Sequence, residues 1–148
     1  MVEEARWEAG KNTHENIIYA CFGGLSNTGI TAALASMEVV KELGLQKVAI
    51  GCLGGLPTNV SPVYGKTQAA VKVITVDGCP FQCSKQIVEA AGFKIAKSIV
   101  LTRDIGMAKK ALHEDIGSGN LRSLMDYISE DDVKKARELI VKAILEKQ

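Results

Sequence analysis

Four cysteines are the residues of this 148-residue chain best suited to chemistry. Cys21 and Cys52 each follow a short apolar run, whereas Cys79 and Cys83 both follow a third run. Thiolates bind soft metal ions, and they are also the nucleophiles of thiol–disulfide exchange. The sequence therefore indicates metal or redox chemistry, provided that the fold brings these side chains to one place.

The segment 73–83 predicts a buried strand, a sharp turn and the start of a helix. Gly78 permits the turn, and Pro80 suits the first position of a helix, which would make Cys79 its N-cap. Cys83 comes four residues later and would share the same helix face. The positive end of such a helix favours thiolate over thiol, so we expect Cys79 and Cys83 to be the reactive pair.

The elements that would position these cysteines alternate between strand and helix. Strands are predicted at 16–21, 47–52, 71–76 and 98–102, and helices at 28–43, 61–70, 80–92, 107–113 and from 129 onward, with a short helix after 121. This alternation predicts a three-layer α/β fold, flavodoxin-like or Rossmann-like, with a mostly parallel sheet and helices on both faces. The preferred strand order is 2-1-3-4. Residues 1–148 should form one domain, with 1–14 as a loose N-terminal arm that Trp7 could pin to the body.

The carboxyl ends of parallel strands lie at one edge of a sheet, so all four cysteines should lie at that edge. Adjacent strands are about 4.8 Å apart, and sulfurs around a tetrahedral zinc ion are about 3.8 Å apart, so neighbouring strand ends could supply one site. Any single cysteine is better explained as core packing, because cysteine is often buried. Four at one edge favour a shared site instead.

The spacing of the cysteines does not select the metal. Zinc ribbons use two tight Cys-x2-4-Cys pairs, and here only Cys79 and Cys83 are tightly spaced, while Cys21 and Cys52 are single. Zinc is the first expectation, and an iron–sulfur cluster or copper(I) is the alternative, because soft thiolates suit all three.

The contexts of these cysteines resemble a prokaryotic family named after its Asp-Gly-Cys (DGC) motif. Asp77-Gly78-Cys79-Pro80 with Cys83 is similar to that motif. The segments that begin at Cys21, Cys52 and Leu101 are similar to other parts of the family, so that the resemblance covers about 17–110. It implies a zinc-binding protein that uses the four cysteines.

A second candidate site is the glycine-rich loop after the first strand. Its spacing is that of a phosphate-binding loop, but Ile30 stands where the lysine should be, which argues against nucleoside triphosphates. A smaller anion could still bind backbone N–H groups there. The residues concerned are Gly24, Ser26, Asn27 and Thr28.

Asp77 and Asp104 also lie at strand ends, where they could support metal ligands, although turn and capping roles are more common for such residues.

Composition narrows the choice of partners. The chain is 47% hydrophobic and 24% charged with a formal net charge of +1, so no strong field favours nucleic acid or an anionic membrane. No secretory signal or spanning segment is evident at the sequence level, and we expect a cytoplasmic protein. Its oligomeric state is not determined by the sequence.

Three functions are compatible with these features. The first is binding of zinc or a related soft metal by Cys21, Cys52, Cys79 and Cys83. The second is a thiol enzyme that uses Cys79 and Cys83 in redox, persulfide-transfer or arsenical chemistry; phosphatase chemistry is disfavoured because the Cys-x5-Arg loop is absent. The third is binding of a small anion or nucleotide, with the cysteines as packing. The sequence does not decide whether the protein is an enzyme.

Overall fold

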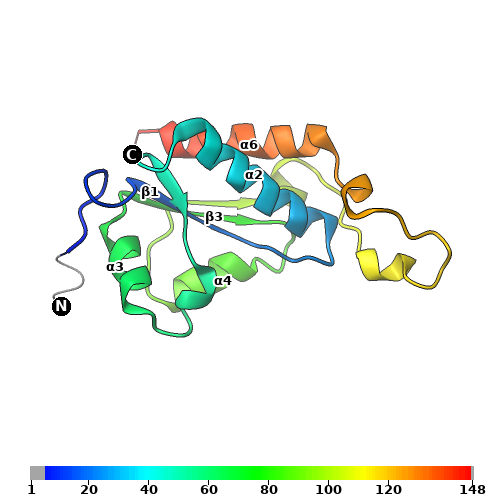
Figure 1. Ribbon diagram of the computed structural model, residues 1–148, viewed down its shortest axis with the longest axis horizontal. Helices are drawn as coiled ribbons and strands as arrows, with labels where there is room; N and C mark the ends of the chain where they lie inside the picture. Colours follow the sequence, from blue (N-terminus) through cyan, green and yellow to red (C-terminus); the bar gives the residue numbers. More distant parts are fainter. Residues whose placement is uncertain (1–5, 148) are drawn as a thin grey trace.

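A parallel sheet of four strands forms the centre of the protein (Figure 1). The structure is a computed structural model, and it describes residues 6–147. The strands are β1 (Asn16–Ala20), β2 (Val48–Ile50), β3 (Lys72–Asp77) and β4 (Lys97–Val100). Their order is β2-β1-β3-β4 and every pairing is parallel, which confirms the α/β class and the strand order predicted from the sequence.

Helices cover both faces of this sheet, as Figure 1 shows. Helices α2 (Asn27–Leu43) and α6 (Glu130–Leu145) lie on one face, and α3 (Ser61–Ala69) and α4 (Cys83–Ala90) lie on the other. Side chains alternate along a strand, so Ile18 of β1 packs under α2 and α6 while its neighbours Ile17 and Tyr19 pack under α3 and α4. The sheet is therefore buried between two apolar layers.

Local sequence explains where α2 and α6 begin and end. The Ser26 hydroxyl accepts a hydrogen bond from Gly29 N–H and caps α2, which ends at Gly44 as predicted. The Ser129 hydroxyl caps α6 in the same way, by accepting from Asp132 N–H. Small buried residues, among them Ala35 of α2, lie in the cluster that joins α2, α6 and the sheet, and they let the helices approach closely.

The helix after β3 begins later than the sequence predicted. Pro80 is not its first residue and Cys79 is not its N-cap, because the segment 79–82 forms a turn in which Gln82 N–H donates to Cys79 O at 3.1 Å. Gln82 then adopts a left-handed conformation, with φ of 51°, and α4 begins at Cys83. Cys79 therefore lies in the turn and Cys83 is the first helical residue.

The predicted helix over residues 107–113 is wrong. A short helix, α5 (Leu101–Asp104), follows β4 directly, and Gly106 with φ of 69° ends it. The next residues run extended beside the start of α2, where Leu112 N–H donates to Leu25 O at 2.8 Å. Only the 3-10 turn η2 (Leu112–Asp115) is helical in this region.

The remaining segments are short turns. The turn η1 (Leu53–Gly55) follows β2, and η3 (Leu124–Tyr127) is a 3-10 turn where a short helix was expected. Residues 6–14 of the expected N-terminal arm carry hydrogen bonds to the body, such as Gln46 Nε2 to Gly10 O at 2.8 Å; residues 1–5 lie outside the described residues. Within residues 6–147, no helix has the length and apolar character needed to cross a membrane.

We predict that Lys72 stabilises the fold by capping the end of α6. Lys72 is only 8% exposed, and its Nζ donates to Ala143 O and Ile144 O, both at 3.1 Å, and to Glu146 O. Lys72→Met should lower the free energy of unfolding by about 1–3 kcal/mol, because buried carbonyls lose a charged donor. Urea unfolding measures this. Lys134→Met, at an exposed position of α6, is the control and should change it by less than about 0.5 kcal/mol; equal effects would contradict the prediction.

Candidate functional site

All four cysteines are free thiols at the carboxyl side of three neighbouring strands. Cys21 directly follows β1, Cys52 follows β2, and Cys79 and Cys83 follow β3. Cys21 and Cys79 are half-buried, whereas Cys52 and Cys83 are exposed. The common edge predicted from the sequence is therefore present, and the contacts of each thiol show how far the four converge.

Cys21 lies between the loops that follow β1 and β3. Its N–H donates to Val76 O at 2.9 Å, and its sulfur accepts backbone N–H groups of Gly23 and Gly78. Burial raises the pKa of the Cys21 thiol, the two N–H groups lower it, and the charges of Asp77 and Cys83 raise it further. The net effect of these surroundings favours the protonated thiol of Cys21 over its thiolate.

Asp77 joins the end of β3 to the start of α4. Its side chain is buried, and its carboxylate oxygens accept Ser84 N–H at 2.8 Å and Lys85 N–H at 3.2 Å. Burial raises the pKa of Asp77, and the bonds from Ser84 and Lys85 lower it. The carboxylate thus caps α4, and it fixes Cys83 and Ser84 relative to the sheet.

Cys79 has a lysine beside it that the sequence did not indicate. Lys109 Nζ lies 3.5 Å from Cys79 Sγ and 4.6 Å from the centroid of the exposed Phe81 ring. Lys109 is 30 residues away along the chain and lies in the segment wrongly predicted as a helix, so no local pattern could have paired it with Cys79.

The polar residues of the β1–α2 loop make bonds within the protein. Ser26 caps α2 and its hydroxyl also bonds that of the buried Thr28 at 2.8 Å. Asn27 holds the 108–110 segment: its Nδ2 donates to Ala108 O at 3.0 Å and its Oδ1 accepts Lys110 N–H at 2.7 Å. Gly24 is exposed. Anion binding by these four residues stays a prediction.

Cys52 and Asp104 have other neighbours. Cys52 occupies the residue before η1, and its charge raises the pKa of Tyr19, after the larger effect of burial. Asp104 accepts Val100 N–H at 2.8 Å and bonds Arg103 through both carboxylate oxygens, which closes the turn after β4. The bond from Arg103 lowers the pKa of Asp104.

The donor chemistry of this edge suits a soft metal ion, but the thiols do not form a closed cluster. Among residues 6–147, no group of three or more His, Cys, Asp or Glu side chains has the arrangement of a metal site. The pairing of β1 with β3 does bring Cys21 next to Asp77, because Cys21 N–H donates to Val76 O at 2.9 Å.

A model of the DGC domain matches residues 17–128 of the chain. The chain belongs to the DGC domain family. The match begins in β1 and ends just after η3, so the DGC domain includes all four cysteines and Lys109, while α6 lies beyond it. The resemblance inferred from the cysteine contexts is confirmed. A comparison with curated proteins and one with solved structures gave no match.

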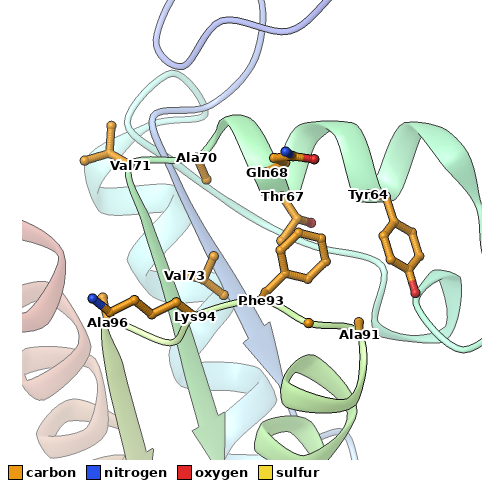
Figure 2. A pocket seen from close by; sticks show the side chains of 11 residues that line it. Tyr64, Thr67, Gln68, Ala70, Val71, Val73, Ala91, Phe93, Lys94 and Ala96 are labelled. Carbon is orange, nitrogen blue, oxygen red and sulfur yellow. The ribbon is translucent and has the colours of Figure 1, made fainter. Parts of the chain in front are cut away.

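A pocket of about 510 Å³ lies at the other end of the sheet from the DGC cysteines (Figure 2). It is lined by residues at the start of β3, such as Val73, by Tyr64 of α3 and by Phe93 of the segment that follows α4; the ring centroids of Tyr64 and Phe93 are 5.5 Å apart. Lys94 is its one charged lining residue among the described part of the chain, and no cysteine lines it. We call the carboxyl side of the sheet, where the four cysteines lie, the thiol edge. Its chemistry therefore does not extend into this pocket.

We predict that the Asp77 cap is needed for stability. Asp77→Ala should lower the free energy of unfolding by about 1–2 kcal/mol, because Ser84 and Lys85 N–H lose their acceptor. Asp77→Asn should cost less, since its amide oxygen can still accept one bond and no charge is buried. Urea unfolding of metal-free protein measures both. If Asp77→Asn lowered the free energy of unfolding as much as Asp77→Ala, a single acceptor oxygen would not be enough, and both carboxylate oxygens would be needed.

We predict that Asp104 makes stability depend on pH on the acid side. Its pKa is lower in the folded protein, so its contribution is present above the unfolded pKa and is lost as the pH falls through the folded value. The parent should be more stable than Asp104→Asn at pH 7, and the difference should shrink below about pH 4. Urea unfolding across this range measures it; a difference independent of pH would contradict the assignment.

Proposed function

We propose that the carboxyl edge of this DGC domain binds a soft metal ion, with zinc as the first candidate and Cys21, Cys52, Cys79 and Cys83 as the donors. Iron–sulfur and copper(I) chemistry are the alternatives for the same thiols. The proposal is supported by the position of all four thiols after neighbouring strands, and by the chemistry of thiolates, which are preferred ligands of these metals.

One observation carries the proposal: Cys21 and Asp77 lie next to each other across the paired ends of β1 and β3, where Cys21 N–H donates to Val76 O at 2.9 Å. Asp77 in turn binds Ser84 N–H, next to Cys83 at the start of α4. Burial is the main cause that disfavours the Cys21 thiolate, and the charges of Asp77 and Cys83 add to it. A divalent cation would reverse this balance, because a nearby positive charge favours the ionised forms of thiols and carboxylates. The arrangement is thus better suited to a protein with a bound cation than to one without.

The residues around Cys21 would also orient it as a ligand. Gly23 and Gly78 N–H groups already donate to its sulfur, and such outer hydrogen bonds hold ligands in place in metal sites. A bound metal would supply positive charge and Lewis acidity there. Since a thiol must lose its proton to become a ligand, affinity should fall as the pH is lowered.

We predict that Cys21→Ser and Cys83→Ser each lower zinc affinity at least tenfold, because each removes a thiolate from the part of the edge where charged groups converge. Zinc content after purification without chelator, and competition with a chromophoric chelator, measure the effect. Thiol counts before and after unfolding show which sulfurs the metal protects.

Cys52→Ser tests the fourth proposed donor, which follows the edge strand β2 and whose charge acts on Tyr19. If it weakens zinc binding as much as Cys21→Ser, all four thiols are ligands. If it has no effect, the site consists of the other three. Parent protein that retains no zinc and gives no competition would overturn the proposal. Circular dichroism should show each variant folded, since a chain of this length does not need a metal to form its core.

The small-anion alternative gains no support from the contacts of the β1–α2 loop, because Ser26, Asn27 and Thr28 side chains all bond within the protein. Thiol chemistry, in contrast, is favoured by a specific observation, the position of Lys109 beside Cys79.

A further inference from the structure

A lysine, a thiol and an aromatic ring meet on the surface at the end of β3. Lys109 Nζ is 3.5 Å from Cys79 Sγ and 4.6 Å from the centroid of Phe81. The Phe81 side chain is 69% exposed and Lys109 is also exposed, so a small molecule can reach all three groups. Cys79 is half-buried and does not stand alone, because exposed Cys83 begins the helix four residues later.

Lys109 is held in this position by the residues on either side of it. Asn27 binds Ala108 O and Lys110 N–H with its side chain, and its own N–H donates to Lys110 O at 3.3 Å. These three bonds fix the backbone around Lys109 to the start of α2. The ammonium group is therefore presented to Cys79 by a constrained loop, and not by a freely moving side chain alone.

We propose that Cys79 is a nucleophilic thiol that exchanges with small disulfides carrying negative charge, and that Lys109 provides the cationic contact for this reaction. The Cys79 thiolate attacks one sulfur of the disulfide, the new S–S bond forms as the old one breaks, and the departing thiolate takes up a proton from water. The products are a mixed disulfide at Cys79 and one free thiol. No electrons are gained or lost overall, because one disulfide replaces another.

The position of Lys109 explains both the site and the substrate class. Negative charge is spread over three sulfurs during the exchange, and a fixed ammonium 3.5 Å from the attacking sulfur stabilises it. The same ammonium attracts a carboxylate on the incoming disulfide, and the Phe81 ring offers an apolar surface beside it. A neutral or cationic disulfide lacks that attraction. The exchange takes place in metal-free protein, so it does not depend on the metal binding proposed above.

The test uses reduced, metal-free protein and three disulfides of different charge: oxidised glutathione (negative), bis(2-hydroxyethyl) disulfide (neutral) and cystamine (positive). Mass spectrometry follows the first adduct with time. Fragmentation of the tryptic peptide 73–85, which contains both Cys79 and Cys83, locates it. We expect the first adduct at Cys79. We define the rate ratio as the rate with oxidised glutathione divided by the rate with the neutral disulfide. Lys109→Gln should lower this ratio roughly fivefold, because one positive charge near the surface is lost.

Three further variants separate the role of Lys109 from a general effect of charge or folding. Lys109→Arg keeps the charge and should retain most of the preference for the negative disulfide. Lys134→Gln removes one positive charge from an exposed site on α6 and should leave the rate ratio unchanged. Asn27→Ala should also lower the rate ratio, because the backbone around Lys109 loses its two hydrogen bonds to the Asn27 side chain. Circular dichroism should show that this variant is folded.

Two results would overturn this proposal. One is a first adduct on Cys83, Cys52 or Cys21 in the parent protein. The other is an unchanged rate ratio in Lys109→Gln. Neither result bears on zinc binding, and a protein that fails to bind zinc would leave the exchange reaction intact.

Discussion

The arrangement of the thiol edge depends on a contact between two stretches of backbone. Gly78, in the turn after β3, lies against the first turn of α2: a Cβ atom at this position would come within 2.5 Å of Thr28 C and 2.6 Å of Gly29 N. Gly29 in turn lies against the β1–α2 loop, where its Cβ would be 2.7 Å from Gly23 O. Side chains at these glycines would force three segments apart.

This contact determines the surroundings of the cysteines on both sides of it. Gly78 packs against Gly29, and Gly29 packs against Gly23, so that the N–H groups of Gly78 and Gly23 both reach the Cys21 sulfur. The same contact fixes the first turn of α2 against the turn after β3. Asn27 begins that helix, so the loop that it holds, and Lys109 with it, is brought to Cys79. Gly78, the glycine of the Asp-Gly-Cys motif, is thus required for close packing against α2, whatever chemistry the neighbouring cysteine performs.

The sheet could be predicted because its signals are local. The β-branched run at the centre of β3 marks a strand buried on both faces, and Gly44 marks the end of α2. The start of α2 was predicted at Thr28, whereas Ser26 caps it in the structure. The strand order was a preference based on the fold class, in which the first strand lies at the centre, and the observed order agrees with it. The carboxyl-edge position of the four cysteines then follows from the parallel pairing alone.

The two local errors arise from hydrogen bonds that the local helix patterns do not show. Residues 107–112 have high helix propensity, but hydrogen bonds to Leu25 and Asn27 hold the segment extended beside α2. Pro80 is a good first helical residue, yet the Asp77 carboxylate binds Ser84 and Lys85 N–H, which places the helix start at Cys83. The partner of the first segment, Asn27, lies more than 80 residues away along the chain, whereas Asp77 lies only seven residues before Ser84. The Lys109–Cys79 contact could not be predicted because Lys109 lies in the first of these segments, 30 residues from Cys79.

The loops that carry the cysteines are packed against the body to different extents, which the sequence did not show. This packing decides how closely the thiols can approach one another. On the β2 side, η1 is anchored close to Cys52: Leu56 is 1% exposed, and a Cβ on Gly55 would lie 2.8 Å from Val63 Cγ2. Drawing Cys52 toward Cys21 would disturb this packing. On the β3 side, Phe81 is largely exposed, and Cys83 is exposed at the first position of α4. A ligand can therefore gather the thiols of β1, β3 and α4 with smaller rearrangements than it needs to recruit the thiol of β2.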